Sequence, residues 1–277
     1  RPRLAAGPDR FLDDLLDRFL LPDGAFAASL DADSQGREGI YYTWTPSEVN
    51  AVLGGAEGEG FVHHWLNPQA GLEDGRSVVQ VMKERQVERL PSLWDRCSAS
   101  RLQLLQARRQ RVAPGLDDKV LVSWNAMMIS ALARAGATLE EPRYLAAARS
   151  ALGAVWHGSR VGGRLCHSRR GDQVGREVFL EDHAFLLLAL LDLYEATFHP
   201  GDLALARELG GEMLAWYHPN PEAPLTMTPQ DQAAHLPVRR VLEDDALPSA
   251  NAAALTGILR LARHTGDALM RQRGESV

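Results

Sequence analysis

Hydrophobic residues recur along the chain at intervals of three and four, which is the period of an amphipathic α-helix. The first such run extends from Phe11 to Leu20 and ends near Pro22 and Gly24, two residue types that stop helices. Further helices are predicted over residues 91–112, 123–135, 142–157, 181–198, 202–217 and 249–265. The pattern therefore predicts an all-α protein.

One more helix start is marked by its capping residues. Thr45, Pro46 and Glu48 combine an N-cap, a proline at the first helical position and the glutamate of a capping box. Just before it, residues 24–45 mix glycines with aromatic and acidic residues, which favours an extended excursion or a β-hairpin. The most strand-like runs are residues 40–44 and 163–168. We therefore expect short β excursions between the helices.

Three helix pairs form an internal repeat. The segments ALARAGATLEEPRYLAAA, DLYEATFHPGDLALARELG and LRLARHTGDALMRQR each contain an apolar helix, a short turn and a second helix. Gly136, Gly201 and Gly266, which we interpret as turn glycines, lie 65 residues apart. The returns at 158–180 and 218–248 are long, so elaborated loops should gather at one rim. This asymmetry indicates an α/α barrel, with a plain bundle or a solenoid as the alternative.

Composition narrows the classes of function. The 277 residues carry a formal net charge of −6 with 45% hydrophobic and 24% charged residues, which is typical of a globular protein and leaves no basic surface for nucleic acid. The only cysteines are Cys97 and Cys166, too few for a disulfide framework or a cysteine zinc site, so a reducing cytoplasm is expected. No apolar run is long enough for a membrane span, and no motif indicates a cofactor or a metal. The first residues, RPRLAAGPDR, and the last, RQRGESV, are expected to be cuts through a larger architecture.

A polar cluster stands at the start of each apolar helix of the repeat. If these helices ring a common axis, the clusters converge on one mouth of the barrel. Each cluster also has a simpler interpretation, because acids and serines at helix starts are ordinary caps and an acidic pair beside a lysine can be a structural ion pair. The three clusters are Asp117, Asp118, Lys119, Trp124 and Asn125; then Glu181, Asp182 and His183; then Asp244, Asp245, Ser249 and Asn251.

The residue types at this mouth suit carbohydrate chemistry. Glycoside hydrolysis needs two carboxyl groups, and epimerisation needs a group, commonly histidine, that removes and returns a proton. We therefore take as catalytic candidates Asp117, Asp118, Glu181, Asp182 and His183. Aromatic rings can stack on sugars, although buried packing is the commoner role of such residues. The ligand-binding candidates are Lys119, Trp124, Asn125, Ser249, Asn251, Asp31, Asp33, Tyr42 and Trp44.

Four blocks resemble, in the same order, the thioredoxin-domain-containing, spermatogenesis-associated-protein-like family, also called the domain-of-unknown-function 255 family. They are DADSQGREGIYYTWTPSEV, LDDKVLVSWNAMMISALARAG, FLEDHAFLLLALLDLYEATF and LPSANAAALTGILRLARHTGD. The resemblance implies a six-hairpin α/α barrel similar to N-acylglucosamine 2-epimerases and some glycosidases, without the thioredoxin-like part and its redox activity. At about 65 residues per unit, the chain holds roughly four hairpins, so we expect one incomplete barrel domain over residues 1–277.

The chain departs from the family pattern at three positions. Ala126 and Ala250 stand where the family usually has glycine, and His183 stands where it usually has tyrosine. An alanine in place of glycine limits how closely another backbone can approach.

Three hypotheses about function follow. The first is a barrel that binds a sugar or sugar-like small molecule at its rim and acts as an epimerase or a glycoside hydrolase. The second is a non-catalytic binding or regulatory module of a thioredoxin-domain-containing protein. The third is a truncated, inactive family member that self-associates through an open barrel edge.

Overall fold

The computed structural model describes residues 2–67, 73–80, 97–220, 222–229, 231 and 239–275, with the backbone alone for residues 2–10. The chain divides into two compact units, Arg1–Ser29 with Asp118–Val277 and, between them in sequence, Leu30–Asp117. Each unit is described by itself, and the single domain expected over residues 1–277 stays a prediction.

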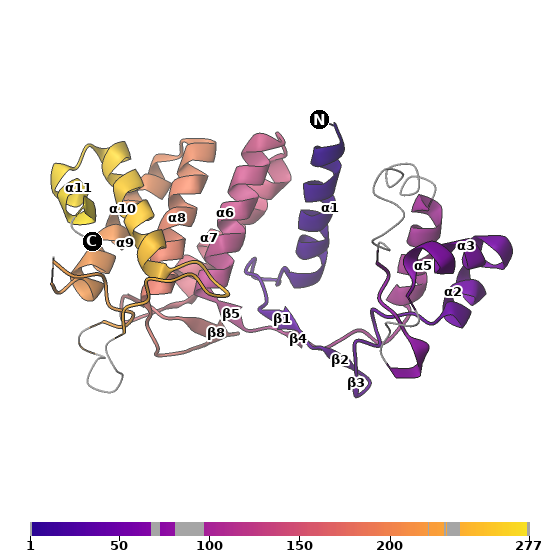
Figure 1. The fold of residues 1–277 in the computed structure, drawn as a ribbon. Coiled ribbons are helices and arrows are strands. Elements are labelled where there is room, and N and C mark those ends of the chain that lie inside the picture. Colours follow the sequence, from indigo (N-terminus) through magenta and orange to yellow (C-terminus); the bar gives the residue numbers. More distant parts are fainter. Residues whose placement is uncertain are drawn as a thin grey trace. The chain divides into compact units, whose positions relative to one another are not determined.

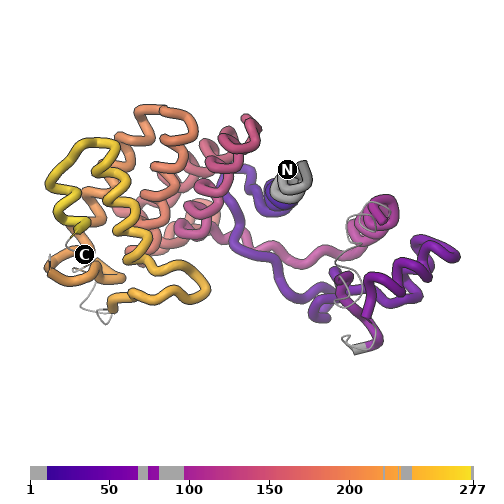
Figure 2. Tube along the Cα trace, turned by 45° about the horizontal axis from the view of Figure 1, so that its top comes forward, coloured from indigo at the N-terminus to yellow at the C-terminus, as the bar shows by residue number. Residues whose placement is uncertain are grey.

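The larger unit consists of consecutive α/α hairpins. They are α6 (Val122–Thr138) with α7 (Pro142–Gly158), α8 (Leu180–Thr197) with α9 (Pro200–Tyr217), and α10 (Ala250–Thr265) with α11 (Ala268–Glu275). The helix α1 (Pro2–Phe19) belongs to the same unit. Helix α8 packs against both α6 and α10, so these three form an inner row, and α7 and α9 each pack against the helix before them (Figures 1 and 2). The predicted fold class, an all-α chain forming an incomplete α/α barrel with short β excursions, is confirmed.

The hairpin turns are tight, as the sequence predicts, but only one of the three glycines occupies a turn. Gly266 caps α10 with a φ of 69°, in the left-handed region that glycine adopts without strain. Gly136 lies inside α6 and Gly201 in the first turn of α9. A Cβ at Gly136 would stand 2.7 Å from the Leu145 side chain, so this glycine permits close packing of α6 on α7. The interpretation of Gly136 and Gly201 as turn glycines is wrong.

The core of the larger unit is centred on α8. Its sequence is apolar nearly all round, which a helix tolerates only when it is covered on most sides. Helices α6, α9 and α10 provide that cover. The fully buried leucines of α8 are Leu180, Leu186, Leu187, Leu190, Leu191 and Leu193.

Short strands lie in the segments that lead into the inner helices α6 and α8. In the larger unit they are β5 (Val120–Leu121), β6 (Arg160–Val161), β7 (Arg164–Leu165), β8 (Ser168–Arg170) and β9 (Gln173–Val174). Strand β8 pairs antiparallel with β5 and with β9, and the registers join Val120 to Arg169 and Arg169 to Val174. This small sheet ties the start of α6 to the segment that precedes α8.

The smaller unit has a second, separate core. It contains α2 (Pro46–Leu53), α3 (Gly55–Trp65), α5 (Ser98–Arg109), a 3-10 turn at Glu73–Gly75 and the strands β2 (Asp33–Ser34) and β3 (Arg37–Glu38). At its edges in sequence lie β1 (Ser29–Leu30) and β4 (Leu116–Asp117), which pair. The predicted capping box is present in α2: the Thr45 hydroxyl accepts from the Glu48 N–H at 3.2 Å, and the Glu48 carboxylate accepts from the Thr45 N–H at 2.9 Å.

Two predictions from the sequence, a strand-like run at 40–44 and a helix over 91–112, fall in this unit. The strand-like run 40–44 is wrong except at Trp44, which makes a single bridge to Ser77, because the residues before it form a turn. Of the predicted helix 91–112, residues 98–109 form α5, and residues 91–96 lie outside the described part of the chain.

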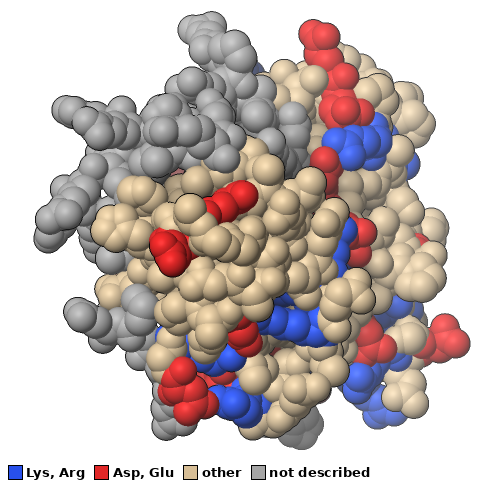
Figure 3. All heavy atoms as spheres, turned by 90° about the vertical axis from the view of Figure 1, so that its right-hand side faces the viewer, with Lys and Arg blue, Asp and Glu red and all other residues tan. Residues whose placement is uncertain are grey.

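Acidic and basic side chains are interspersed on the face shown in Figure 3. Within the described residues, no helix combines the length and the apolar character that crossing a membrane would require.

Candidate active site

The starts of α6 and α8 meet at one rim, together with the β7–β8 connection. The Val122 N–H donates to the carbonyl of His167 at 2.9 Å, and the His167 N–H donates to the carbonyl of Glu177 at 2.8 Å. These backbone bonds bring the imidazole of His167 to the first turn of α8. Val122 and His167 are far apart in the sequence, and the pairing of β5 with β8 brings them together.

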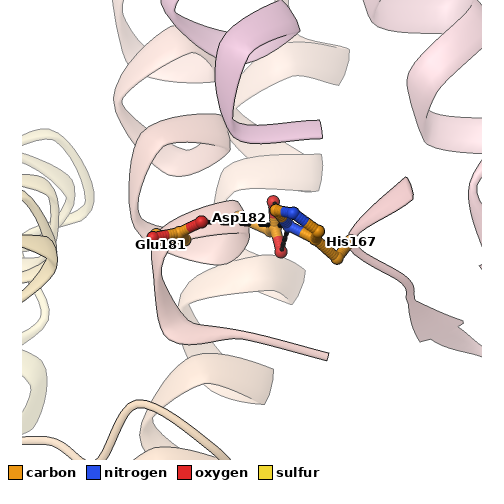
Figure 4. A group of neighbouring side chains, drawn as sticks. All are labelled: His167, Glu181 and Asp182. Atoms are coloured by element: carbon orange, nitrogen blue, oxygen red, sulfur yellow. Dashed lines mark hydrogen bonds and ion pairs between the residues drawn. The ribbon is translucent and has the colours of Figure 1, made fainter. Parts of the chain in front are cut away.

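Three titratable side chains form a cluster at this rim (Figure 4). The His167 Nδ1 lies 3.1 and 3.0 Å from the two carboxylate oxygens of Asp182, and 3.8 Å from an oxygen of Glu181. The backbone N–H of Ser123 donates to Asp182 Oδ1 at 3.0 Å, so α6 also holds this carboxylate in place. The Asp182 side chain is 0% exposed, whereas those of His167 and Glu181 are 24% and 26% exposed. Asp182 is thus a buried support, and His167 and Glu181 face outward.

The electrostatics of the cluster favour retained protons. The hydrogen bond to Asp182 raises the pKa of His167 above its ordinary value, with further help from the charges of Asp182, Glu181 and Glu177. Burial raises the pKa of Glu181, as does the neighbouring charge of Asp182. Burial also raises the pKa of Asp182, against the opposing hydrogen bonds from His167 and Ser123. Two partly exposed groups with raised pKa values at one rim are suited to proton transfer.

The same donor atoms could also hold a metal ion. One ligand atom from each of His167, Glu181 and Asp182 lies within 4.8 Å of the others. In the structure, however, the His167 Nδ1 is hydrogen-bonded to Asp182, and a metal at this position would have to replace that bond. We therefore interpret the cluster as an acid–base pair on a buried carboxylate, and the expectation of no metal stays a prediction.

The asparagines of the first and third clusters bind the chain itself. The Asn125 Oδ1 accepts from the Phe26 N–H at 2.7 Å, and its Nδ2 donates to the carbonyls of Phe26 and Leu121 at 2.9 and 3.0 Å. Asn251 repeats this arrangement: it pairs with the N–H and carbonyl of Leu225 at 2.8 and 3.2 Å, and donates to the Val241 carbonyl at 3.0 Å. Both side chains are buried with both amide hydrogens used. We call these two residues the asparagine clasps, and they are braces rather than ligand contacts.

His183 is the fourth residue of α8, as Asn125 is of α6. Its Nδ1 lies 3.3 Å from the Phe179 carbonyl, four residues earlier, and 3.2 Å from the Tyr217 hydroxyl. The ring is fully buried, and burial lowers the pKa of His183 to about 4. An imidazole without exposed atoms is out of reach of a substrate at the rim, and its lowered pKa makes it a weak base. The structure therefore corrects the assignment of His183 as a catalytic residue.

The remaining candidates of the larger unit take varied places. Asp118 forms an exposed ion pair with Arg170 at 2.5 Å, which is the structural alternative considered for this acid. Ser249 is a buried N-cap whose hydroxyl accepts from the Ala252 N–H at 3.3 Å and donates to the Val241 carbonyl at 3.0 Å. Lys119 is exposed. Trp124 is 44% exposed and directly follows Ser123 in α6, so it stays a ligand-binding candidate.

The other candidates belong to the smaller unit. Asp117 lies in β4, and Asp31 and Asp33 are exposed, with the Asp31 carboxylate accepting from the Asp33 N–H at 3.0 Å. The Arg108 guanidinium lies 5.4 Å from the ring centre of Tyr42. Trp44 is buried, with Arg111 at 3.9 Å from its ring centre. The structure explains Trp44 as core packing, so its assignment as a ligand contact is not supported.

His167 is the residue that sequence reasoning missed. Its residue type alone gives no signal, because histidines commonly occur on surfaces and in cores. The available signal was its place in the long 158–180 return, which was expected to lie at the rim, just after the strand-like residues Leu165 and Cys166.

The fold and the site together define an α/α-hairpin protein with a histidine, a glutamate and a supporting aspartate at the start of an inner helix. The chain is 31% identical to human spermatogenesis-associated protein 20 over 88% of its length, and 28% identical to an uncharacterized protein of Caenorhabditis elegans over 68%. It spans about a third of the human relative, 36% of that protein's length. No family model matches the chain. The predicted resemblance to spermatogenesis-associated proteins is confirmed to this extent.

Solved structures with similar folds include a sugar epimerase from a ruminal bacterium, with a TM-score of 0.46, 12% identity and coverage of 96% of this chain and 65% of that one. A glycoside hydrolase family 76 mannosidase from Bacteroides thetaiotaomicron has a TM-score of 0.48 and 12% identity, covering 99% of this chain and 70% of its own. Likenesses at this level carry no information about the ligand of this chain.

Proposed function

We propose that this chain binds a sugar or sugar-like metabolite at the rim where α6 and α8 begin, and transfers protons to and from it through His167 and Glu181. The single observation that carries the proposal is the His167–Asp182 pair with Glu181 beside it. In this arrangement Asp182 holds Nδ1, so the imidazole would exchange protons with a substrate through Nε2. A histidine oriented by a carboxylate is an effective general acid and base.

Proton transfer at carbon is favoured here over glycoside hydrolysis. Hydrolysis by two carboxyl groups needs both of them accessible, one to the sugar and the other to the sugar or to the attacking water. Asp182 is fully buried and bonded to His167 and to the Ser123 N–H, so its role is to position the imidazole. His167 and Glu181 remain as the outward pair. One of them, unprotonated, would remove a proton from the carbon, and the other, protonated, would deliver a proton to the opposite face of that carbon or to its neighbour. We therefore propose an epimerase or isomerase reaction.

Trp124 supports a sugar as the ligand class. Its indole is 44% exposed on the first turn of α6, one residue after the N–H that binds Asp182. A large exposed aromatic face at a polar rim suits the apolar face of a pyranose ring.

The test is deuterium exchange at C2 of a panel of aldoses in heavy water, followed by proton NMR with the purified 277-residue chain. We expect exchange that His167→Gln and Glu181→Gln each reduce by about two to four orders of magnitude, because general acid–base groups contribute that much. His157→Gln and Glu208→Gln, which change exposed residues of α7 and α9, serve as matched controls and should leave the rate unchanged.

Other outcomes would overturn this proposal in distinct ways. Loss of exchange in Asp118→Asn but not in His167→Gln would restore the sequence-based assignment of Asp118. Sugar binding without exchange, weakened by Trp124→Ala, would favour the non-catalytic binding module instead.

We also propose the reducing cytoplasm as the location, because Cys97 and Cys166 are both free thiols. Self-association through an open barrel edge stays a prediction, which light scattering of the purified chain would test.

A further inference from the structure

The inner row of helices carries a polar hollow, away from the helix starts. Its volume is about 440 Å³, within the range of small-molecule sites. Glu195, in its lining, lies fourteen residues after Glu181 on α8, which corresponds to about 21 Å along the helix axis. The hollow is therefore distinct from the candidate active site. Its lining residues are Arg134, Ala137, Thr138, Asp192, Glu195, Ala196 and Arg260.

The acceptors in this hollow already have partners. Asp192 accepts from Arg260 at 2.7 Å and from the Ser130 hydroxyl, and Glu195 accepts from Arg260 at 2.9 Å and from His264 at 2.8 Å. Each of the four carboxylate oxygens thus has one protein donor. The ion pairs raise the pKa of Arg260 despite its burial, so this guanidinium stays charged.

The donors, in contrast, are available. Arg134 and Thr138 are both exposed in the hollow. Within the described parts of the chain, neither side chain has a hydrogen-bond or ion-pair partner. Among the described residues, Arg260 donates to the two carboxylates through Nη2. Its Nε and Nη1 are therefore available to a ligand. Arg134 extends from α6 and Arg260 from α10, on either side of the α8 carboxylates. The hollow therefore offers guanidinium donors from two helices.

We propose that this hollow binds a small organic molecule through an oxyanion, either a phosphate or a carboxylate group, with Arg134 and Arg260 as its binding pair. A cation is disfavoured because the positive charges of Arg134 and Arg260 together balance the negative charges of Asp192 and Glu195. A neutral polyol could accept from the available donors, but without the charge-assisted hydrogen bonds that an oxyanion forms with guanidinium groups. Guanidinium groups bind phosphate and carboxylate through paired N–H donors, which matches the groups left available.

The test is isothermal titration calorimetry of the 277-residue chain with glucose 6-phosphate, glucuronate and glucose at constant ionic strength. We expect the two anions to bind at this hollow and the affinity to fall with added salt. Arg134→Gln should weaken anion binding about tenfold or more, since it removes a charged hydrogen-bond donor. Arg207→Gln, an exposed arginine of α9, is the matched control and should leave the affinity unchanged. The anion that binds more tightly shows whether phosphate or carboxylate is the preferred group.

Several results would overturn the proposal. They are binding of neither anion, equal affinity for glucose and glucose 6-phosphate, or equal effects of Arg134→Gln and Arg207→Gln. Loss of anion binding in His167→Gln would place the anion at the candidate active site instead. Circular dichroism of each variant confirms that it is folded, so these outcomes are separate from any failure of sugar turnover.

Discussion

At the scale of single residues, His167 and His183 show how two histidines of one rim acquire opposite properties. His167 faces a buried carboxylate and partly contacts solvent, so its pKa is raised. His183 lies two residues after Glu181 but points into the core, where burial lowers its pKa to about 4. The two shifts act on stability in opposite pH ranges.

The first prediction concerns His167→Gln. A histidine whose pKa is raised by folding contributes stability that is complete below its ordinary pKa, near 6.5, and that is lost as pH rises through the raised value. We expect the variant to lose about 1–2 kcal/mol of unfolding free energy at pH 6, the size of a hydrogen bond to a charged group. Urea unfolding at several pH values should show this difference shrinking by pH 9, and a difference independent of pH would contradict the prediction.

The second prediction concerns His183→Asn. A histidine that burial keeps neutral makes the folded chain less stable as pH falls below 6.5, because in this range the unfolded chain takes up a proton and the folded chain does not. The wild-type chain should lose about 3 kcal/mol between pH 6.5 and pH 4 through this residue. Asparagine, which is the fourth residue of α6, keeps a donor for the Phe179 carbonyl without titrating. The unfolding free energy, measured by denaturation at several pH values between 6.5 and 4, should therefore fall less steeply for the variant than for the wild-type chain. Identical slopes would show that His183 is not responsible.

At the scale of elements, the asparagine clasps explain how each inner helix is joined to the segment after an outer helix. Asn125 holds Phe26, which follows α1, and Asn251 holds Leu225, which follows α9. The neighbouring backbone bonds also match, from Ala27 to the last residue of α1 and from Thr226 to the last residue of α9. By this correspondence α1 is joined to α6 in the same way as α9 is joined to α10.

The third prediction is that Asn125→Ala and Asn251→Ala each destabilise the larger unit by about 2–4 kcal/mol. Each change leaves buried backbone groups without partners, which costs more than the loss of an average hydrogen bond. Asn50→Ala, at an exposed position of α2, should change the unfolding free energy by less than about 0.5 kcal/mol. Chemical denaturation of the three variants measures this, and similar values for all three would remove the clasp interpretation.

At the scale of the whole molecule, the two units have separate cores. Trp44, Phe61, Trp65 and their neighbours form one cluster, and the residues of α1 and α6–α10 form the other. Separate cores predict separate effects of mutation.

The fourth prediction is that Trp44→Ala destabilises the smaller unit alone, by about 3–5 kcal/mol. Hydrogen exchange measured by mass spectrometry should show faster exchange in α2, α3 and α5 while α6–α10 keep their protection. Leu187→Ala, in the core of the larger unit, should give the reverse pattern. Loss of protection in both units from either change would contradict the prediction.

The sequence predicts most of the helices because their causes are local, but it misses α3, whose first half is rich in glycine and so lacks a helix signal. The spacing of leucines and alanines defines the apolar faces of α6–α10, and the Thr45–Glu48 capping box places the start of α2. The polar starts of the inner helices are also visible, since their positions repeat. The sequence does not show which of those polar residues face outward. Side chains such as those of Asp182, His183 and Asn125 occur both as hydrogen-bonded groups in cores and as ligand contacts in sites.

What the sequence by itself determines is therefore most of the helices, the pairing of the helices of the larger unit into hairpins and the rim at which polar residues gather. These follow from periodicity and capping, which act within a few residues. The tertiary structure alone decides that His167 joins Glu181 and Asp182 while His183 and the asparagines are enclosed. That choice depends on the pairing of β5 with β8 and on the packing of α8 between its neighbours, and a contact between distant segments has no local signal.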